Sequence, residues 1–389
     1  MTFRTLALLA AMAAFAFTGP ATAQPRVPVG PYAGFANVWD SAFSTDGRRL
    51  ATGCESQGRI SICVFDLEAA EMTAVIPAPQ GADIRRFFWA GEHQLIYTVL
   101  GMDRWNWGEG NKPIPINRPV YFDARTGDQK LFLEQERFMG GGFTVASPLL
   151  DDPDHVAIRL TYGIRQAPLP GSRLNTLPDF GTEIRRIELG AGGVGRQVMS
   201  RLDSVVDIAL DAYGEPIAEV RYDSEGRYAL RVVENGERRT ILEGRDERGG
   251  LAIWGKIAGR NALAISMFDE RWRRMRIDLA SGELTPLEDN ATPMVDPATN
   301  EVVGYITARG GMPEQTFVDP QLAELHGQLK GVLAPARVTL DSWSLDRTMA
   351  LVAARATGEP TQYYLMDVGA RELSVFDVQA EPPVTPERR

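Results

Sequence analysis

Short apolar stretches that alternate with polar turns recur along most of the chain. Two such stretches, Asp40–Leu67 and Asp341–Val368, lie near opposite ends, and each reads as two β-strands joined by a polar turn. Similar units occupy the intervening sequence, at Ile84–Gly101 with Asn117–Leu133, Val145–Gly163 with Gly181–Leu189, Val205–Leu242, Leu251–Leu287 and Ala291–Thr307. The pattern therefore indicates seven copies of one structural unit.

Each unit shows the same order of features. A short apolar strand, a turn rich in Asp, Gly or Asn, and a second apolar strand precede an alternating strand that ends in a motif such as VFDLEAAE, YFDARTGD, RIDLASGE or LMDVGARE. Strands at such short spacing favour an all-β protein over alternating strands and helices. Four strands per unit at a period of about 40 to 50 residues are typical of β-propeller blades. We therefore expect an all-β fold, a seven-bladed β-propeller.

One segment departs from this pattern. Asp319–Leu333 carries leucines at helical spacing, with Asp319 as N-cap and Pro320 in the first turn. The sequence predicts a short helix inserted in blade six. His326 lies in it, and because no acid or nucleophile is spaced beside this histidine, we expect it to lie on the helix surface or to be packed, and not to be catalytic.

The N-terminal residues read as a targeting segment. Arg4, an apolar run from Leu6 to Phe17, and Ala21 and Ala23 before Gln24 match a secretory signal peptide, whose apolar run is shorter than the roughly 20 residues of a spanning helix. We predict a signal peptide at 1–23, a propeller domain at 24–378 and a Pro-rich tail at 379–389. The mature protein is expected to be periplasmic or secreted and not to span a membrane.

The amino-acid composition limits the classes of partner that the protein is expected to bind. The 389 residues are 44% hydrophobic and 24% charged, which is typical of a folded protein. Lys and Arg number 41 against 51 Asp and Glu, giving a formal charge of −10. This balance argues against nucleic acid as the main partner.

The two cysteines, Cys54 and Cys63, flank the sequence ESQGRISI. A tight turn at Gly58 and Arg59 would place them opposite each other on paired strands. An oxidising compartment permits a disulfide there, whereas two buried free thiols are the alternative.

No motif for a cofactor or metal has its required context. GAGGVG at 190–195 matches the glycine spacing of a dinucleotide site, but a strand and not a helix is expected to follow it. The carboxylates of DDPDH at 151–155 lack the spacing and central Gly of a calcium loop. We therefore predict no cofactor and no metal.

A long insertion in the second unit, Gly101–Pro119, carries Arg104, Trp105 and Trp107. Aromatic side chains on a loop supply contact area for a peptide or protein partner. The alternative is that the two tryptophans fold back over the blade edge.

The last unit resembles a known family. Trp343, Asp346 and Arg347, and then Tyr363, Tyr364 and Asp367, together with the preceding helical segment, are similar to the final blades of the N-terminal propeller in bacterial prolyl-oligopeptidase-family serine peptidases. The branch meant contains acylaminoacyl-peptidase-like enzymes and lasso-peptide isopeptidases. In that family the catalytic triad lies in a C-terminal α/β-hydrolase domain, and its serine sits in a G-x-S-x-G turn. No serine of this chain has that context, so no catalytic residue is carried over.

Three hypotheses follow. The resemblance implies the non-catalytic propeller portion of an exported peptidase, which caps a hydrolase domain and gates peptide access to it. A free-standing periplasmic propeller of the Tol-Pal type that binds a protein partner is the alternative. A lyase or hydrolase acting in the central channel would need convergent polar side chains, and the chain has three histidines, His93, His155 and His326.

Overall fold

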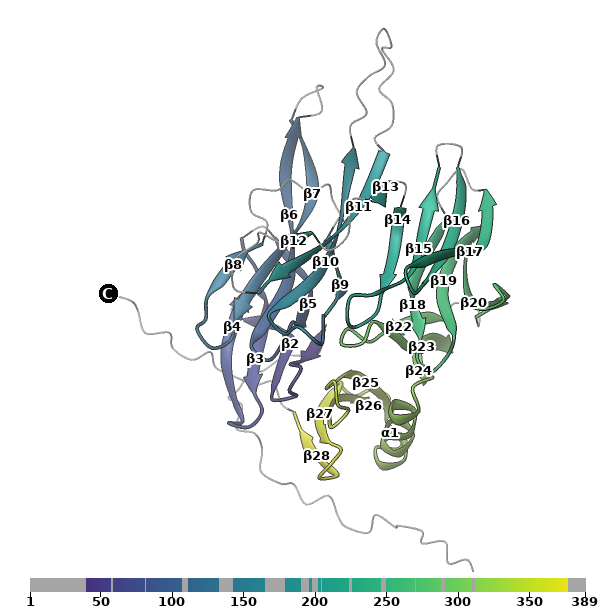
Figure 1. Ribbon diagram of the computed structural model, residues 1–389. Helices are drawn as coiled ribbons and strands as arrows, with labels where there is room; N and C mark the ends of the chain where they lie inside the picture. The colour runs from purple at the N-terminus through teal and green to yellow at the C-terminus, as the bar shows by residue number, and fades with distance from the viewer. Residues whose placement is uncertain are drawn as a thin grey trace, which may run out of the picture.

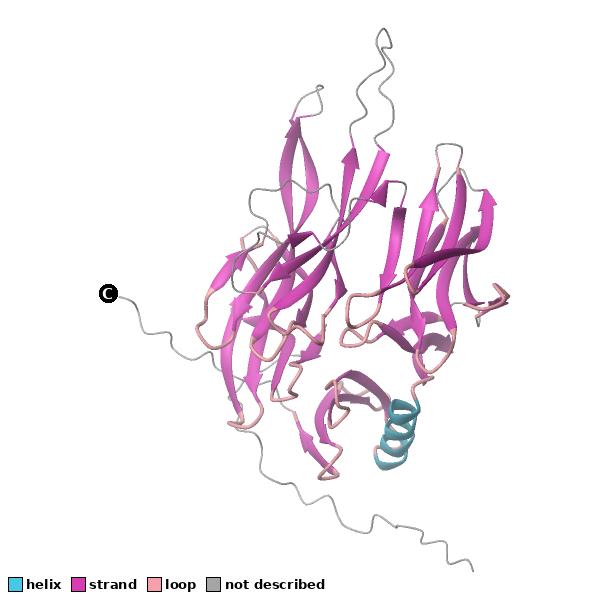
Figure 2. Ribbon diagram, viewed as in Figure 1, coloured by secondary structure: helices cyan, strands magenta, loops and turns pink. Residues whose placement is uncertain are grey.

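The structure is a computed structural model that describes residues 40–56, 59–80, 82–106, 111–132, 143–164, 179–189, 196–197, 202–203, 205–223, 226–245, 250–269, 271–287, 291–309 and 312–376. These residues form mainly antiparallel β-sheets and one helix (Figures 1 and 2). The predicted all-β class with one short helix is confirmed. The predicted signal peptide, glycine run and C-terminal tail lie outside the described residues.

Consecutive strands form antiparallel meanders, here called units and numbered in chain order. The first three units contain β1 (Ser41–Phe43), β2 (Arg49–Ser56), β3 (Arg59–Asp66) and β4 (Glu71–Pro77); β5 (Asp83–Trp89), β6 (Gln94–Asn106), β7 (Asn111–Asp123) and β8 (Gln129–Leu131); and β9 (Phe143–Ser147), β10 (His155–Ile164), β11 (Asp179–Glu188), β12 (Arg196–Gln197) and β13 (Leu202–Asp203).

The remaining units follow the same order. They contain β14 (Val205–Leu210), β15 (Pro216–Tyr222), β16 (Arg227–Glu234) and β17 (Glu237–Arg245); β18 (Leu251–Ile257), β19 (Ala262–Asp269), β20 (Arg271–Asp278) and β21 (Leu284–Pro286); β22 (Thr292–Val295), β23 (Glu301–Arg309) and β24 (Met312–Phe317), then helix α1 (Pro320–Val332); and β25 (Arg337–Trp343), β26 (Met349–Arg355), β27 (Gln362–Asp367) and β28 (Glu372–Val375).

The sequence repeat is visible at atomic level in the turns after β1 and β25. Ser44 Oγ donates to Asp46 Oδ1 at 2.6 Å and accepts from the Arg49 backbone N–H at 2.9 Å. Ser344 makes the same two bonds, with Asp346 at 2.6 Å and the Met349 N–H at 2.9 Å. A serine and an aspartate two residues apart thus define both turns.

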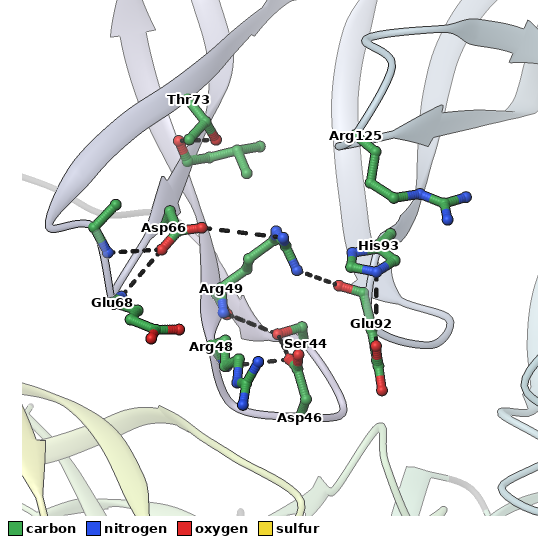
Figure 3. A network of polar contacts seen from close by, with 12 residues as sticks. Ser44, Asp46, Arg48, Arg49, Asp66, Glu68, Thr73, Glu92, His93 and Arg125 are labelled. Carbon is green, nitrogen blue, oxygen red and sulfur yellow. Dashed lines mark hydrogen bonds and ion pairs between the residues drawn. The ribbon is translucent and has the colours of Figure 1, made fainter.

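The first of these turns also contacts the second unit. Figure 3 shows Arg49 between Asp66 of its own unit and Glu92 of the next. Its guanidinium lies 4.0 Å from the Asp66 carboxylate and donates to the Glu92 carbonyl at 3.1 Å. The turn therefore links neighbouring units as well as neighbouring strands.

The predicted Asp motifs end the third strand of their units. Asp66, Asp123, Asp278 and Asp367 each accept backbone N–H bonds from residues two or three positions later. This local bonding stabilises the turn to the outer strand. The prediction that these motifs end the alternating strand of their units is confirmed.

Buried apolar clusters lie between the units. Among the described residues, every consecutive pair of units shares one cluster. A further cluster joins the seventh unit to the first and contains Phe43, Phe65, Leu351, Tyr363 and Phe376. Because a single sheet has two faces to bury, this order gives each unit a neighbour on both sides.

Three details differ from the predicted series of seven four-stranded sheets. The third unit has five strands, since β12 and β13 both pair with β11. The fifth and sixth units share one seven-stranded sheet, since β18 pairs with β23 in parallel at Lys256–Glu301 and Ile257–Val302. The sixth unit has three strands, and α1 follows them. Within the described ranges no strand pairing joins the first sheet to the last, so that junction relies on side chains.

Helix α1 is the predicted insertion. Asp319 caps it by accepting the backbone N–H groups of Gln321 and Leu322. His326 is buried, its Nε2 lies 3.1 Å from the Val338 carbonyl oxygen, and burial lowers its pKa. Of the two placements expected for His326, on the helix surface or packed, the structure shows the packed one. In the described part of the chain no helix has the length and apolarity needed to cross a bilayer.

The insertion at Gly101–Pro119 is not a loop along its length. Strands β6 and β7 run through it as a long hairpin, in which Arg104 pairs with Pro113 and Trp105 with Lys112. The expectation of a loop was wrong for residues 101–106 and 111–119, where the antiparallel pairing of β6 with β7 continues. Trp107 lies outside the described residues, and a partner contact by these side chains stays a prediction.

Candidate functional site

The first strands of several units contact one another. Strand β1 contacts both β5 and β25, β14 contacts β9 and β18, and β18 contacts β22. Side chains on these strands therefore lie where neighbouring units meet. A site formed by several units would lie there.

Irregular pairing places particular side chains in this region. The ladder slips by one residue between Ile253 and Gly255 in β18, and between Leu340 and Ser342 in β25. The extra residues are Trp254 and Asp341, and both are exposed, whereas Leu340 and Ser342 are buried. A bulge redirects a side chain in this way, and bulges often lie next to functional sites.

Asp40 and Asp341 form a carboxylate pair at the junction of the first and last units. Asp40 accepts the Ser41 backbone N–H at 3.0 Å, and Asp341 accepts from Thr339 Oγ1 at 3.2 Å. Ser41 Oγ, next to Asp40, donates to Ser342 Oγ, next to Asp341, at 2.8 Å. This bond brings the two Asp-Ser dipeptides together across the junction.

The environment disfavours the charge of both carboxylates. Burial raises the pKa of Asp40 to about 6, and the nearby Arg86 guanidinium opposes this only in part. Crowding by protein raises the pKa of Asp341 to about 6 even though solvent reaches it, and the negative charge of Asp40 adds to the rise.

The arrangement defines what this candidate site can do. Near pH 7 the pair is mostly ionised and presents two acceptors, with the exposed Arg86 of β5 near Asp40. Such a site can hold a cationic group or exchange protons near pH 6. Across the residues with described positions, no group of three or more His, Cys, Asp or Glu side chains is arranged to hold a metal ion.

Cys54 and Cys63 form a disulfide that lies apart from the carboxylate pair. Cys54 Sγ and Cys63 Sγ are bonded at 2.12 Å within the apolar cluster of the first and seventh units. They are not directly opposed, since Cys54 pairs with Ser61 and Thr52 pairs with Cys63. The predicted turn was wrong by one position, because Ser56 pairs with Arg59 and the turn falls between them.

Sequence reasoning missed the carboxylate pair. The available signal was the shared Asp-Ser dipeptide that begins both terminal repeats, at Asp40 and Asp341. Trp254 and Arg86 have no equivalent sequence signal, because the bulge and the contact between first strands appear only in three dimensions.

No family model matches the sequence, and no curated protein matches it significantly. Solved structures are similar at low identity. A prolyl endopeptidase is 14% identical with a TM-score of 0.45, over 88% of this chain and 50% of that one. The acylaminoacyl peptidase of Pyrococcus horikoshii is 10% identical with a TM-score of 0.43, over 87% and 52%. The β-propeller domain of the trilobed protease from Pyrococcus furiosus is 11% identical with a TM-score of 0.36, over 88% and 82%.

The structural neighbours are thus of the kind that the last unit resembles in sequence. This chain spans about half the length of the two matched peptidases. At these values the similarity says nothing about activity, and the description of the fold rests on the chain's own strands and clusters.

Proposed function

We propose that the chain folds into a seven-bladed β-propeller that controls the access of unfolded peptides to a peptidase site. The observation that carries this proposal is the cyclic order of the apolar clusters, in which the seventh unit packs on the first. Seven units that each pack on two neighbours favour a ring around a central passage. The family resemblance of the last unit supplies the peptidase context.

In this proposal the propeller is not the catalyst. The acyl-transfer chemistry belongs to an α/β-hydrolase domain, either in the same polypeptide or in a separate one. The first strands line the passage, where Asp40, Asp341 and Arg86 offer charged contacts and Trp254 offers an aromatic one. An extended peptide fits a narrow passage, whereas a folded domain does not. Export, as the predicted signal peptide implies, would place this activity in an oxidising compartment.

The proposal is tested by photo-crosslinking. A benzoylphenylalanine replaces Trp254 in the full chain, and a second version replaces Tyr213, which is exposed in the turn between β14 and β15. We expect an unfolded probe polypeptide to crosslink at position 254 more than at position 213, and the same probe in its folded state to crosslink at neither. We also expect no labelling by a serine-directed fluorophosphonate.

Equal crosslinking at positions 254 and 213 would contradict a selective passage. So would crosslinking of the folded probe at position 254. Specific fluorophosphonate labelling that survives repurification would contradict a non-catalytic role. Capture of a folded envelope protein instead of the unfolded probe would favour the Tol-Pal-type alternative.

A further inference from the structure

The turn between β22 and β23, residues 296–300, joins units that are not neighbours, and we call it the sixth-unit turn. At its end, Asn300 Nδ2 donates to the Ala146 carbonyl oxygen of β9 at 2.5 Å and to the Leu210 carbonyl oxygen of β14 at 3.4 Å. These two strands begin the third and fourth units. A side chain of the sixth unit therefore reaches the junction between the third unit and the fourth.

This contact crosses the inside of the cyclic order. The apolar clusters place the fourth and fifth units between the third and the sixth. In the other direction, the seventh, first and second units lie between them. A direct bond between the third and sixth units therefore runs across the space inside this order and not along its rim.

The other end of the sixth-unit turn is fixed to the seventh unit. The Asp296 side chain is buried, and its Oδ2 accepts from Arg347 Nη2 at 2.5 Å, while its Oδ1 accepts the Ala298 backbone N–H at 2.9 Å. A bond between two ionised groups is stronger than a bond from a neutral amide. The amide of Asn300 is therefore the attachment that releases more easily, and Asp296 is the anchor.

The fifth unit leaves room for this turn. A Cβ atom at Gly255 of β18 would lie 2.8 Å from the Asn300 backbone oxygen, so the close approach requires a glycine there. Asn300 has a φ of +59°, a left-handed conformation that asparagine adopts more readily than most residues. Both backbone features place the Asn300 amide where the carbonyl groups of the third and fourth units accept it.

Turns between first and second strands gather at one end of the units. The Thr45 backbone N–H donates to the Gly91 carbonyl oxygen at 3.3 Å, and the Leu150 N–H donates to the Ala212 carbonyl oxygen at 2.9 Å. The first unit is thereby joined to the second, and the third to the fourth, through turns of the same kind. The sixth-unit turn is also of this kind, so its contact with the third unit lies at that end.

We infer that the sixth-unit turn closes this end of the central passage and that the Asn300 amide is its latch, an inference that rests on the proposed function. While Asn300 is bonded to the third and fourth units, an extended peptide that enters from the opposite end meets the turn and does not emerge. When the amide is released, the turn stays attached through Asp296 and the passage opens at both ends.

Hydrogen exchange of the full chain, followed by mass spectrometry, tests the latch. Asn300→Gly removes the amide and keeps a residue suited to the left-handed conformation. Asn235→Gly is the matched control, because Asn235 has a φ of +52° in an exposed turn of the fourth unit. We expect Asn300→Gly to speed exchange about tenfold in the sixth-unit turn and in residues 143–150, as loss of one hydrogen bond predicts. Asn235→Gly should leave both segments unchanged.

A second variant reaches the latch from another unit. Gly255→Ala adds a methyl group that displaces the Asn300 backbone, although the sequence of the turn is unchanged. We expect the same increase in exchange in residues 143–150 as for Asn300→Gly. Circular dichroism establishes that each variant is folded.

A trapping experiment tests the closure. The probe is an unfolded polypeptide with a folded fluorescent protein at one end and biotin at the other. Streptavidin is added after binding, so a probe whose biotin end has emerged carries a bulky group on each side and cannot leave. We expect streptavidin to leave the dissociation rate from the unmodified chain unchanged, and to abolish dissociation of the threaded fraction from Asn300→Gly.

The inference is overturned if Asn300→Gly and Gly255→Ala both leave exchange in residues 143–150 unchanged, because the turn is then not latched to the third unit. It is also overturned if streptavidin traps the probe on the unmodified chain, or fails to trap it on Asn300→Gly. If the probe binds no version of the chain while exchange changes as expected, the proposed function fails and the latch stands. The two proposals can therefore fail separately.

Discussion

Replacing Asp341 by Asn removes one charge from the carboxylate pair while keeping its shape. The amide oxygen of Asn can still accept from Thr339 Oγ1, which Asp341 contacts at 3.2 Å. Because the folded state raises the pKa of Asp341 from 3.8 to about 6, that state binds more protons than the unfolded chain between about pH 4 and 6. The free energy of unfolding therefore falls as pH rises through this window and levels off above about pH 7.

The magnitude follows from the size of the rise. A change of about 2 pKa units corresponds to about 3 kcal/mol. Solvent reaches Asp341 and screens its charge, so we expect about 1 to 2 kcal/mol. Asp341→Asn should thus raise the free energy of unfolding by this amount at pH 8 and change it little at pH 4. Asp40→Asn should act in the same direction, since burial raises the pKa of Asp40 as well.

Urea denaturation of the full chain at pH 4, 6 and 8 measures this difference. Asp151→Asn, in an exposed turn of the third unit, serves as a matched control for removing one carboxylate. Comparing the variant with the unmodified chain at each pH cancels the titration of all other groups. The reasoning would be refuted if the difference in free energy of unfolding between Asp341→Asn and the unmodified chain were the same at pH 4 and pH 8. It would also be refuted if the variant were less stable than the unmodified chain at pH 8.

Three further variants probe the junctions between units, each by urea denaturation. Asp296→Asn should lower the free energy of unfolding by about 3 to 5 kcal/mol, because Asp296 is 1% exposed and its Oδ2 lies 2.5 Å from Arg347 Nη2. A loss below about 1 kcal/mol would show that this ion pair is not fixed. Leu325→Ala should lower the free energy of unfolding by about 2 to 5 kcal/mol, because Leu325 packs between α1 and the seventh unit. An unchanged free energy of unfolding would mean that the helix does not stay packed on that unit. Replacing Cys54 and Cys63 together by alanine should lower the free energy of unfolding by about 2 kcal/mol. Chemical reduction of the unmodified chain should produce a similar loss. An unchanged free energy of unfolding after both treatments would contradict the disulfide.

Local features of the fold could be predicted from the sequence. The Asp turns and the N-cap at Asp319 both depend on residues close together in the chain. The repeated strand pattern located the units for the same reason. Such features need only short-range bonding and periodicity, which a sequence displays directly.

Features that depend on the pairing of residues far apart in the chain, or on the exact strand register, could not be predicted from the sequence. The predicted pairing of the two strands that carry Cys54 and Cys63 was shifted, because only the structure shows that Ser56 pairs with Arg59. The shared sheet of the fifth and sixth units depends on two residue pairs, starting at Lys256 and Glu301. The meeting of Asp40 with Asp341 requires strands from opposite ends of the chain to lie side by side.

The packing of the last unit on the first also governs how the protein is made. The hydroxyl groups of Ser41 and Ser342 meet although 301 positions separate them in the sequence. During synthesis Phe43 and Phe65 therefore lack their final neighbours until the seventh unit has left the ribosome. The propeller-like part of the chain is completed only when its last unit covers its first, so loss of the seventh unit would leave the first with an exposed apolar face that favours aggregation.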